Sequence, residues 1–264
     1  MLLAVDIGNT EITVGLFAGE RLTATWRLTT ADSRTPDEWG AALTAYLVNA
    51  GHSTHEVRAA VQASVAPQVT ESLASGMAQA TGVRPVKVDA SSPLPIVLDV
   101  DEPLTVGADR VVNTLAASQL YRRDTIVVDF GTATTFDCVT AEGRFLGGVI
   151  APGLRTAAEN LTRRAAKLPA TELVAPERVI GRRTEDCIRS GVLFGAAEAT
   201  DGIVRRIKAE WPRGKEARGD GPLVVGTGGL VSLVAPLSRE IERVEPHLTL
   251  LGLAIAARHL GLAW

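Results

Sequence analysis

One short motif occurs twice in the chain: an Asp, a Gly two residues later and a threonine close behind. The first copy begins at Asp6 with "DIGNT" and the second begins at Asp129 with "DFGTATT". Each copy directly follows an apolar, strand-like run, "LLAV" in the first case and "TIVV" in the second. A motif repeated in the same local context indicates an internal duplication, which limits the chain to folds with two similar halves.

The residues around the two copies follow the same order in both halves. Residues 2–28 and 124–153 each read as strand, motif, strand, glycine turn and strand, which predicts hairpin-connected strands. Helical patterns follow each set, including 108–121, 154–168, a long helix over 184–211 and a closing helix over 248–261. Residues 211–222 read as a charged surface loop. We therefore expect an α/β fold with a mixed central sheet in each half, divided into residues 1–118 and 119–264.

The chemistry of the motif suits phosphate binding. The Asp places a carboxylate at the end of a buried strand, and the Gly lets the backbone approach a ligand closely. Backbone amides and threonine hydroxyls then donate hydrogen bonds to phosphate oxygens. Two such loops could hold a nucleoside triphosphate with its Mg²⁺. For one loop alone a tight hairpin turn is the simpler reading, but two loops in equivalent positions favour the nucleotide.

Several other functional classes lack their sequence signals. The chain contains no G-x-x-x-x-G-K-[ST] loop and no G-x-G-x-x-G at the start of a βαβ unit. The letters "DFG" at Asp129 lack the H-R-D loop of protein kinases. A formal charge of −3 without a basic, aromatic-rich stretch disfavours nucleic-acid binding. No signal peptide and no apolar run of about 18 residues occurs, so we expect a cytoplasmic protein without a membrane segment.

Five motifs taken in order resemble those of the type III pantothenate kinases, in the superfamily of acetate and sugar kinases, Hsp70 and actin. The resemblance runs nearly end to end and implies two actin-like (ribonuclease H-like) domains. The motifs are Asp6-Ile7-Gly8-Asn9-Thr10, Gly107-Ala108-Asp109-Arg110, Asp129-Phe130-Gly131-Thr132-Ala133-Thr134, "GGVIAPG" (147–153) and "GTGG" (226–229).

The resemblance implies how ATP and cations are bound. Asp129 would bind the activating monovalent cation, K⁺ or NH₄⁺, while Mg²⁺ would arrive with ATP. The "GTGG" glycines would lie against the adenosine, a plain strand-to-helix turn being the alternative. ATP would bind to Asp6, Ile7, Gly8, Asn9, Thr10, Glu11, Ile12 and Thr13 in the first loop and to Thr132 in the second.

The resemblance also implies the substrate site. Gly107, Ala108, Asp109 and Arg110 would bind pantothenate, with Asp109 as the general base. Asp109 stands in the first turn of a predicted helix, whose dipole would hold it ionised; complementing that dipole is the alternative role. Thr184 would contact the substrate, or serve as the N-cap of the long helix.

The activity implied is ATP-dependent phosphorylation of pantothenate to 4'-phosphopantothenate, the first step of coenzyme A synthesis, by a homodimer. A non-catalytic regulatory protein on the same fold and a kinase for another small alcohol or sugar are the alternatives; the intact Asp6, Asp109 and Asp129 speak against the first. Glu11 adds a negative charge beside the triphosphate and is expected to weaken ATP binding. Asp137 has no assigned role.

Overall fold

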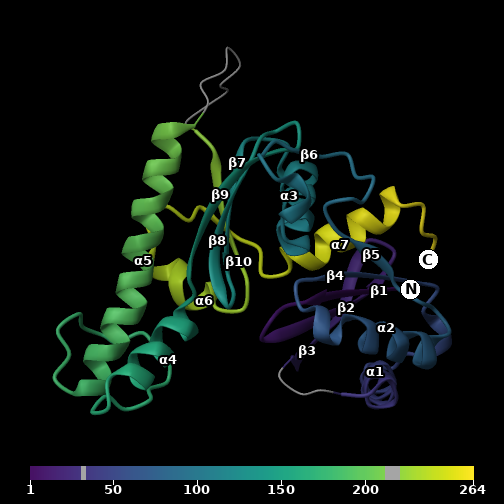
Figure 1. Ribbon diagram of the computed structural model, residues 1–264, viewed down its shortest axis with the longest axis horizontal. Helices are drawn as coiled ribbons and strands as arrows, with labels where there is room; N and C mark the ends of the chain where they lie inside the picture. The colour runs from purple at the N-terminus through teal and green to yellow at the C-terminus, as the bar shows by residue number, and fades with distance from the viewer. Residues whose placement is uncertain (31–33, 212–220) are drawn as a thin grey trace. The chain divides into compact units, whose positions relative to one another are not determined.

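The computed structural model describes residues 1–30, 34–211 and 221–264 and contains two compact units. The first unit consists of Met1–Leu120 together with Leu248–Trp264, and the second of Tyr121–His247. Figure 1 shows both units, coloured along the chain. Most of the charged loop expected over 211–222 falls in residues 212–220, which lie outside the described ranges.

The first unit is built on a mixed sheet of order β3-β2-β1-β4-β5. Its first three strands pair antiparallel, as the hairpin pattern predicts, and β4 and β5 extend the sheet in parallel from β1. The strands are β1 (Leu2–Ile7), β2 (Glu11–Ala18), β3 (Arg21–Thr29), β4 (Ala59–Ser64) and β5 (Val86–Val88).

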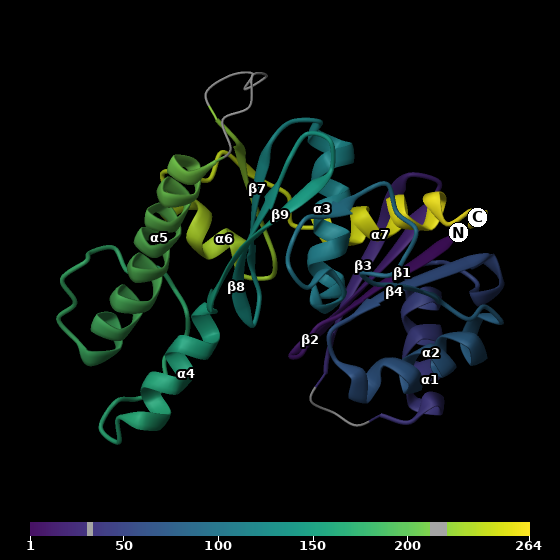
Figure 2. The ribbon, with the colours of Figure 1, turned by 45° about the horizontal axis from the view of Figure 1, so that its top comes forward.

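Helices cover both faces of this sheet (Figure 2). Leu3, Val5 and Ile7 of β1 pack in one apolar cluster with α1 and α2, while Leu2 and Ala4 pack in another with α3 and α7. Because both faces of β1 are buried, its sequence is an almost continuous apolar run. The helical elements of this unit are α1 (Pro36–Asn49), η1 (Thr54–Glu56), α2 (Pro67–Thr81), η2 (Pro103–Thr105), α3 (Ala108–Tyr121) and α7 (Leu248–His259). A short strand, β6 (Val97–Leu98), lies in the Pro-rich connection before α3.

The second unit repeats the same plan. Its strands run in the order β9-β8-β7-β10-β11, with β7, β8 and β9 antiparallel and β10 and β11 parallel to β7. The strands are β7 (Thr125–Phe130), β8 (Ala133–Val139), β9 (Arg144–Pro152), β10 (Leu223–Thr227) and β11 (Arg243–Val244), and the helices are α4 (Leu154–Arg164), α5 (Thr184–Glu210), α6 (Val231–Val234) and η3 (Ala235–Leu237). The duplicated α/β architecture inferred from the repeated motif is thus present.

The closing helix α7 groups with the first unit, whereas the division into 1–118 and 119–264 placed it with the second half. Leu250 and Leu253 belong to the apolar cluster that also contains β1, and the Thr249 hydroxyl donates a 2.9 Å hydrogen bond to Asn113 Oδ1 of α3. These contacts join segments far apart in sequence, so local patterns do not reveal them. Within the described ranges, every helix is too short or too polar to cross a lipid bilayer.

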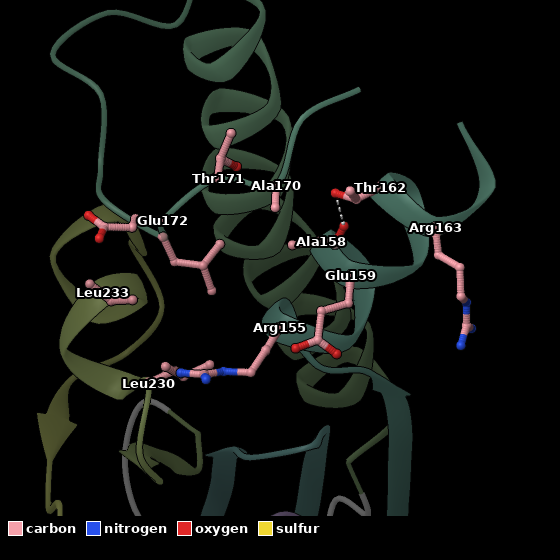
Figure 3. Close-up of a pocket in the computed structure, with 11 residues that line it drawn as sticks. Arg155, Ala158, Glu159, Thr162, Arg163, Ala170, Thr171, Glu172, Leu230 and Leu233 are labelled. Atoms are coloured by element: carbon pink, nitrogen blue, oxygen red, sulfur yellow. Dashed lines mark hydrogen bonds between the residues drawn. The ribbon is translucent and has the colours of Figure 1, made fainter. Parts of the chain in front are cut away.

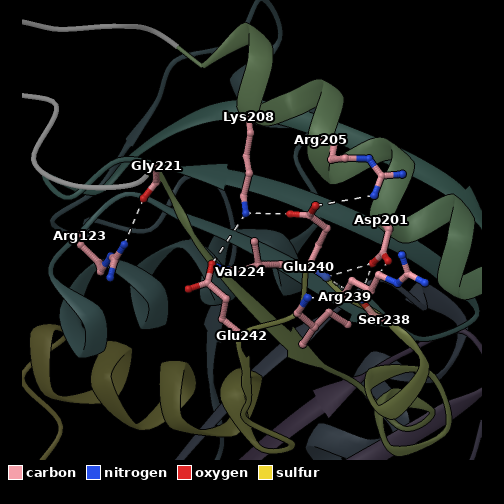
Figure 4. A network of polar contacts seen from close by, with 11 residues as sticks. Arg123, Asp201, Arg205, Lys208, Gly221, Val224, Ser238, Arg239, Glu240 and Glu242 are labelled. Carbon is pink, nitrogen blue, oxygen red and sulfur yellow. Dashed lines mark hydrogen bonds and ion pairs between the residues drawn. The ribbon is translucent and has the colours of Figure 1, made fainter.

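A polar network fixes α5 to the loop after η3 (Figure 4). The buried carboxylate of Asp201 accepts hydrogen bonds from Ser238 Oγ at 2.5 Å and from the amides of Arg239 at 2.9 Å and Glu240 at 3.2 Å. The Glu240 carboxylate in turn accepts a 2.9 Å hydrogen bond from Lys208 Nζ. Asp201 therefore supplies the acceptors for the partly buried amides of this loop.

Candidate active site

The first motif forms the tight turn between β1 and β2. The Gly8 amide donates to the Glu11 carbonyl at 3.0 Å, which closes the turn. Thr30, the residue directly after β3, also supports the turn: its hydroxyl donates to the Gly8 carbonyl at 2.8 Å and its amide to the Thr10 carbonyl at 3.0 Å. With these carbonyls occupied by protein donors, the turn has a fixed shape before any ligand binds.

The second motif forms the equivalent turn between β7 and β8. The Gly131 amide donates to the Ala133 carbonyl at 3.0 Å. The Thr132 carbonyl accepts from the Gly153 amide at 3.2 Å and from the Thr156 hydroxyl at 2.8 Å. A β-carbon on Gly153 would lie 2.4 Å from the Thr132 carbonyl oxygen, so only glycine allows this approach. The last glycine of "GGVIAPG" therefore anchors the start of α4 to the second turn.

Asp6 and Asp129 occupy equivalent positions in the two units. Each is the penultimate residue of its strand, and each lies opposite a threonine of the following strand, Thr13 for Asp6 and Thr135 for Asp129. Directly opposed residues of an antiparallel pair point to the same face of the sheet. Each unit therefore presents a carboxylate and a hydroxyl together beside its glycine turn.

The "GTGG" segment lies against Asp129. Gly228 has a φ of +90°, and a β-carbon there would lie 2.3 Å from Asp129 Oδ1 and 2.7 Å from the Phe130 amide nitrogen. The Leu230 amide donates to the Phe130 carbonyl at 3.2 Å. This segment is thus a turn from β10 towards α6 that also touches a proposed site residue.

Asp109 is at the start of α3, as the sequence predicts, and Ala108 before it is buried in the core. The Arg110 amide donates to Asp109 Oδ1 at 2.8 Å. Burial raises the pKa of the Asp109 carboxyl above its ordinary value, although the Arg110 amide and guanidinium lower it. Burial therefore opposes the effect of the helix dipole, which by itself would favour the ionised carboxylate.

The first turn and the substrate segment meet within the first unit at Val65. The Val65 amide donates to the Ile7 carbonyl at 3.0 Å, directly before Gly8. A β-carbon on Gly107 would lie 3.5 Å from Val65 Cγ1 and 2.6 Å from Asp109 Oδ1. Two motifs separated by about a hundred residues in sequence are therefore neighbours in the structure.

Glu11 has a basic neighbour that the sequence alone did not reveal. Its carboxylate lies 3.4 Å from Arg27 Nε on the adjacent strand β3, and both side chains are about half exposed. Cross-strand pairs of opposite charge partly cancel each other's field. The negative charge of Glu11 is accordingly offset by a positive charge on the same surface.

Thr184 is the first residue of α5, and the N-cap is Arg183, which makes no side-chain capping bond. The alternative reading of Thr184 as an N-cap is therefore wrong. Its side chain lines a largely apolar groove of about 640 Å³ between α4 and α5. Gly191 and Gly195 line the same groove, and a β-carbon on either would meet nothing within 4 Å. Among the described residues, no other segment therefore packs closely on these two glycines.

A second cavity, of about 590 Å³, is lined by residues of α4, of the segment that follows it and of the region of α6 (Figure 3). Leu173, Leu230 and Leu233 give it apolar surface, and the side chains of α4 contribute charge through Arg155 and Glu159. The buried Thr171 Oγ1 also lines it and has no hydrogen-bond partner among the described residues. Arg155 closely follows Gly153, and Leu230 is bonded to Phe130, so the cavity adjoins the turn of Thr132.

Asp137 is fully buried in β8. It lies opposite Val127 of β7 and Gly148 of β9, two residues beyond Thr135. Side chains alternate along a strand, so Asp137 shares a sheet face with Thr135 and Asp129. No sequence signal predicted this placement.

Comparisons with known proteins agree on the family that the motifs resemble. A family model described as type III pantothenate kinase matches residues 2–206. The protein named type III pantothenate kinase of Thermomicrobium roseum is 44% identical over 97% of this chain and 96% of its own length. Type III pantothenate kinase 1 of Symbiobacterium thermophilum is 45% identical over 97% of this chain and 95% of its own length.

Solved structures of low sequence identity share the fold. Component A of the Acidaminococcus fermentans (R)-2-hydroxyglutaryl-CoA dehydratase has a TM-score of 0.57 at 16% identity, covering 99% of both chains. The ethanolamine utilization protein EutJ of Carboxydothermus hydrogenoformans has a TM-score of 0.53 at 17% identity, covering 96% of this chain and 88% of that one. The actin-like fold expected for the chain is thereby confirmed.

Proposed function

Because this chain belongs to the type III pantothenate kinases, we propose that it transfers the γ-phosphoryl group of ATP to the primary hydroxyl of pantothenate, the first step of coenzyme A synthesis. The observation that carries the proposal is the placement of Asp109 at the start of α3, adjoining the first glycine turn through Val65. A kinase needs a base for the acceptor hydroxyl close to the phosphate-binding loop.

In this proposal Asp109 accepts the hydroxyl proton while the new O–P bond forms and ADP departs. Its raised pKa makes it a stronger base than an exposed Asp, which suits proton transfer near neutral pH. Arg110, next along α3, supplies a guanidinium that can pair with the pantothenate carboxylate. Gly107 leaves the carboxylate of Asp109 unobstructed on the side where a β-carbon would collide with it.

ATP is bound by both turns in this proposal. The residues 6–13 and Thr132 supply amides and hydroxyls for the phosphates. We place the adenosine in the cavity beside the second turn, where Leu173, Leu230 and Leu233 offer apolar surface to the purine and the Thr171 hydroxyl is available to a ring nitrogen. Mg²⁺ would enter with ATP and keep most of its waters.

Asp129 is our candidate for the monovalent cation site, for K⁺ or NH₄⁺. A bound cation would neutralise phosphate charge near the second turn. The donor set fits such an ion, since one carboxylate with the Thr135 hydroxyl opposite it and nearby backbone carbonyls gives hard oxygen ligands of low total charge. Within the described residues, no group of three or more His, Cys, Asp or Glu side chains could hold a metal ion.

We further propose that two copies of the chain pair over the groove between α4 and α5. Gly191 and Gly195 cost helix stability, and in the described part of the chain nothing lies within 4 Å of a β-carbon placed on either, which leaves room for a second copy to approach. Val179 and Ile180, just before α5, are 65% and 85% exposed and would add apolar surface to such an interface. Thr184, on the same groove, would then contact substrate beside the interface.

The groove proposal predicts that Gly191→Arg yields a monomer in sedimentation velocity, while Gly202→Arg on the same helix leaves the dimer intact. Gly202 also has nothing within 4 Å of its β-carbon position but does not line the groove. A dimer that survives Gly191→Arg would contradict this location.

The kinase proposal is tested by incubating the purified protein with ATP and pantothenate and identifying products by mass. Phosphopantothenate and ADP in equal amounts, with no product from glucose or glycerol, are expected. ATP turnover on another small alcohol with none on pantothenate would assign the chain a different acceptor. No turnover on any acceptor would favour a regulatory protein.

A further inference from the structure

The turn formed by residues 227–230 packs closely against the end of strand β7. Thr227 pairs with Asp129 in parallel register, and the Leu230 amide donates to the Phe130 carbonyl at 3.2 Å. Between these two attachments Gly228 crosses directly over the Asp129 side chain. The turn is itself closed by a 3.3 Å hydrogen bond from the Val231 amide to the Gly228 carbonyl, so its path is fixed.

The contact at Gly228 leaves no room for any side chain. A β-carbon would lie 2.3 Å from Asp129 Oδ1, 2.7 Å from the Phe130 amide nitrogen and 2.8 Å from the Phe130 carbonyl carbon. Two of these three atoms belong to the backbone of a buried strand and cannot move aside cheaply. The third is the carboxylate oxygen, which would have to shift by about 1 Å or rotate away to restore an ordinary contact.

We propose that Gly228 is a positioning residue for Asp129, holding its carboxylate in the orientation that binds the monovalent cation. This inference depends on the proposed function, because it assumes that a cation binds at Asp129. Gly228 borders the space that the Asp129 carboxylate occupies. A β-carbon at position 228 would displace this carboxylate, so the cation would lose its charged ligand while the other ligands stay in place.

The positive φ of Gly228 could by itself explain why this position is a glycine, without any role for Asp129. Gly221 separates the two explanations. It precedes β10 as Gly228 follows it, and its φ is +99°, but a β-carbon there would meet nothing within 4 Å. Gly221→Ala therefore introduces comparable backbone strain without touching Asp129.

The test compares wild type, Gly228→Ala and Gly221→Ala for the K⁺ concentration that gives half-maximal phosphorylation of pantothenate. We expect Gly228→Ala to raise this concentration at least tenfold, to regain much of its turnover at saturating K⁺ and to keep the wild-type KM for pantothenate. Gly221→Ala should keep the wild-type K⁺ dependence. A rescue by K⁺ distinguishes positioning from a general loss of structure.

A binding measurement without turnover accompanies the kinetics. Tl⁺ serves as the probe for the monovalent site, and its affinity is followed by thallium NMR on wild type and on each variant. Weaker Tl⁺ binding to Gly228→Ala alone supports the proposal. Wild-type Tl⁺ affinity in Gly228→Ala, or an equal loss in Gly221→Ala, overturns it.

Asparagine provides a second variant in case alanine prevents folding. Asn tolerates a positive φ better than other residues with a β-carbon, yet it keeps the β-carbon that collides with Asp129. Gly228→Asn should therefore fold and show the same loss of K⁺ and Tl⁺ affinity. Inactive wild-type protein would instead count against the proposed function, and active wild type that ignores K⁺ would count against Asp129 as the cation site.

Discussion

The carboxylate of Asp109 occupies the space that a β-carbon on Gly107 would need. A β-carbon on Gly107 would lie 2.6 Å from Asp109 Oδ1, and that same oxygen accepts the 2.8 Å hydrogen bond from the Arg110 amide. Gly107 and the Arg110 amide therefore both border the carboxylate of Asp109, in a site whose burial disfavours the charged form. A charge kept where it costs folding free energy is typical of a functional residue.

Replacing Asp109 with Asn should lower kcat by a factor of about 10² to 10⁴, the usual contribution of a general base. The fold should not suffer, because the amide keeps the shape of the carboxylate and removes a charge that burial penalises. Steady-state kinetics and thermal unfolding at neutral pH check both parts. Near wild-type turnover in Asp109→Asn would rule out Asp109 as the base.

The raised pKa of Asp109 sets the pH dependence. Since the carboxylate must be ionised to accept a proton, kcat/KM should fall with decreasing pH through a midpoint above the ordinary Asp pKa of 3.8. The free energy of unfolding depends on pH in the opposite direction. Above the raised pKa the folded protein carries a buried charged carboxylate, which lowers the free energy of unfolding. Below pH 3.8 the carboxyl is protonated in both the folded and the unfolded state, so this cost vanishes. Asp109→Asn should accordingly have a higher Tm than wild type at neutral pH, and this difference should shrink as the pH is lowered. An acid midpoint at or below 3.8 would contradict the assignment.

Thr30→Val removes the hydroxyl that supports the first turn and leaves the amide bond to Thr10 in place. We expect a several-fold rise in KM for ATP, an unchanged KM for pantothenate and a loss of about 1 kcal/mol in the free energy of unfolding. Thr23→Val is the matched control, since Thr23 lies on β3, the strand directly before Thr30, and its hydroxyl donates to the Leu16 carbonyl at 2.9 Å, away from the turn. Equal effects of both variants on KM for ATP would refute a specific role for Thr30.

The pair of Glu11 and Arg27 predicts a double-mutant cycle. Arg27→Gln uncovers the negative charge of Glu11 beside the phosphate turn and should raise KM for ATP about two- to threefold at low salt, since exposed pairs are weak and screened. The double variant with Glu11→Gln should return KM towards the wild-type value. Additive effects of the two changes would show that Arg27 does not act through Glu11.

Asp201→Asn tests the polar network that holds α5. An Asn side chain offers one acceptor oxygen to three donors that now share a carboxylate, so we expect a loss of about 2–3 kcal/mol in the free energy of unfolding. Glu71→Gln, which breaks the exposed ion pair with Arg84, should cost no more than about 0.5 kcal/mol. Denaturant unfolding measures both, and a similar cost for the two variants would contradict the role of Asp201.

Patterns in the sequence predict the parts of this structure that depend on interactions between residues close together in the chain. The hairpins around Asp6 and Asp129 follow from alternating apolar residues and glycine turns, and α3 and α5 begin at Ala108 and Thr184, the positions the patterns indicate. The duplication then implies two similar sheets. These features depend on neighbours in the chain.

Contacts between distant segments could not be predicted in this way. Nothing in the sequence near Thr30 marks it as the support of Gly8, and the collision that keeps Gly228 a glycine involves a strand about a hundred residues earlier. The same holds for α7, whose apolar residues show that it is buried but not which unit buries it. The burial that raises the pKa of Asp109 likewise comes from the folded structure and not from the residues next to it in sequence.

The most direct test of the account is the initial rate of phosphopantothenate formation from ATP, measured with K⁺ or NH₄⁺ present and then with Na⁺ in their place. The account predicts rapid formation of product with K⁺ or NH₄⁺ and a large loss of rate with Na⁺. No phosphopantothenate under any of the three cations would contradict its central claim.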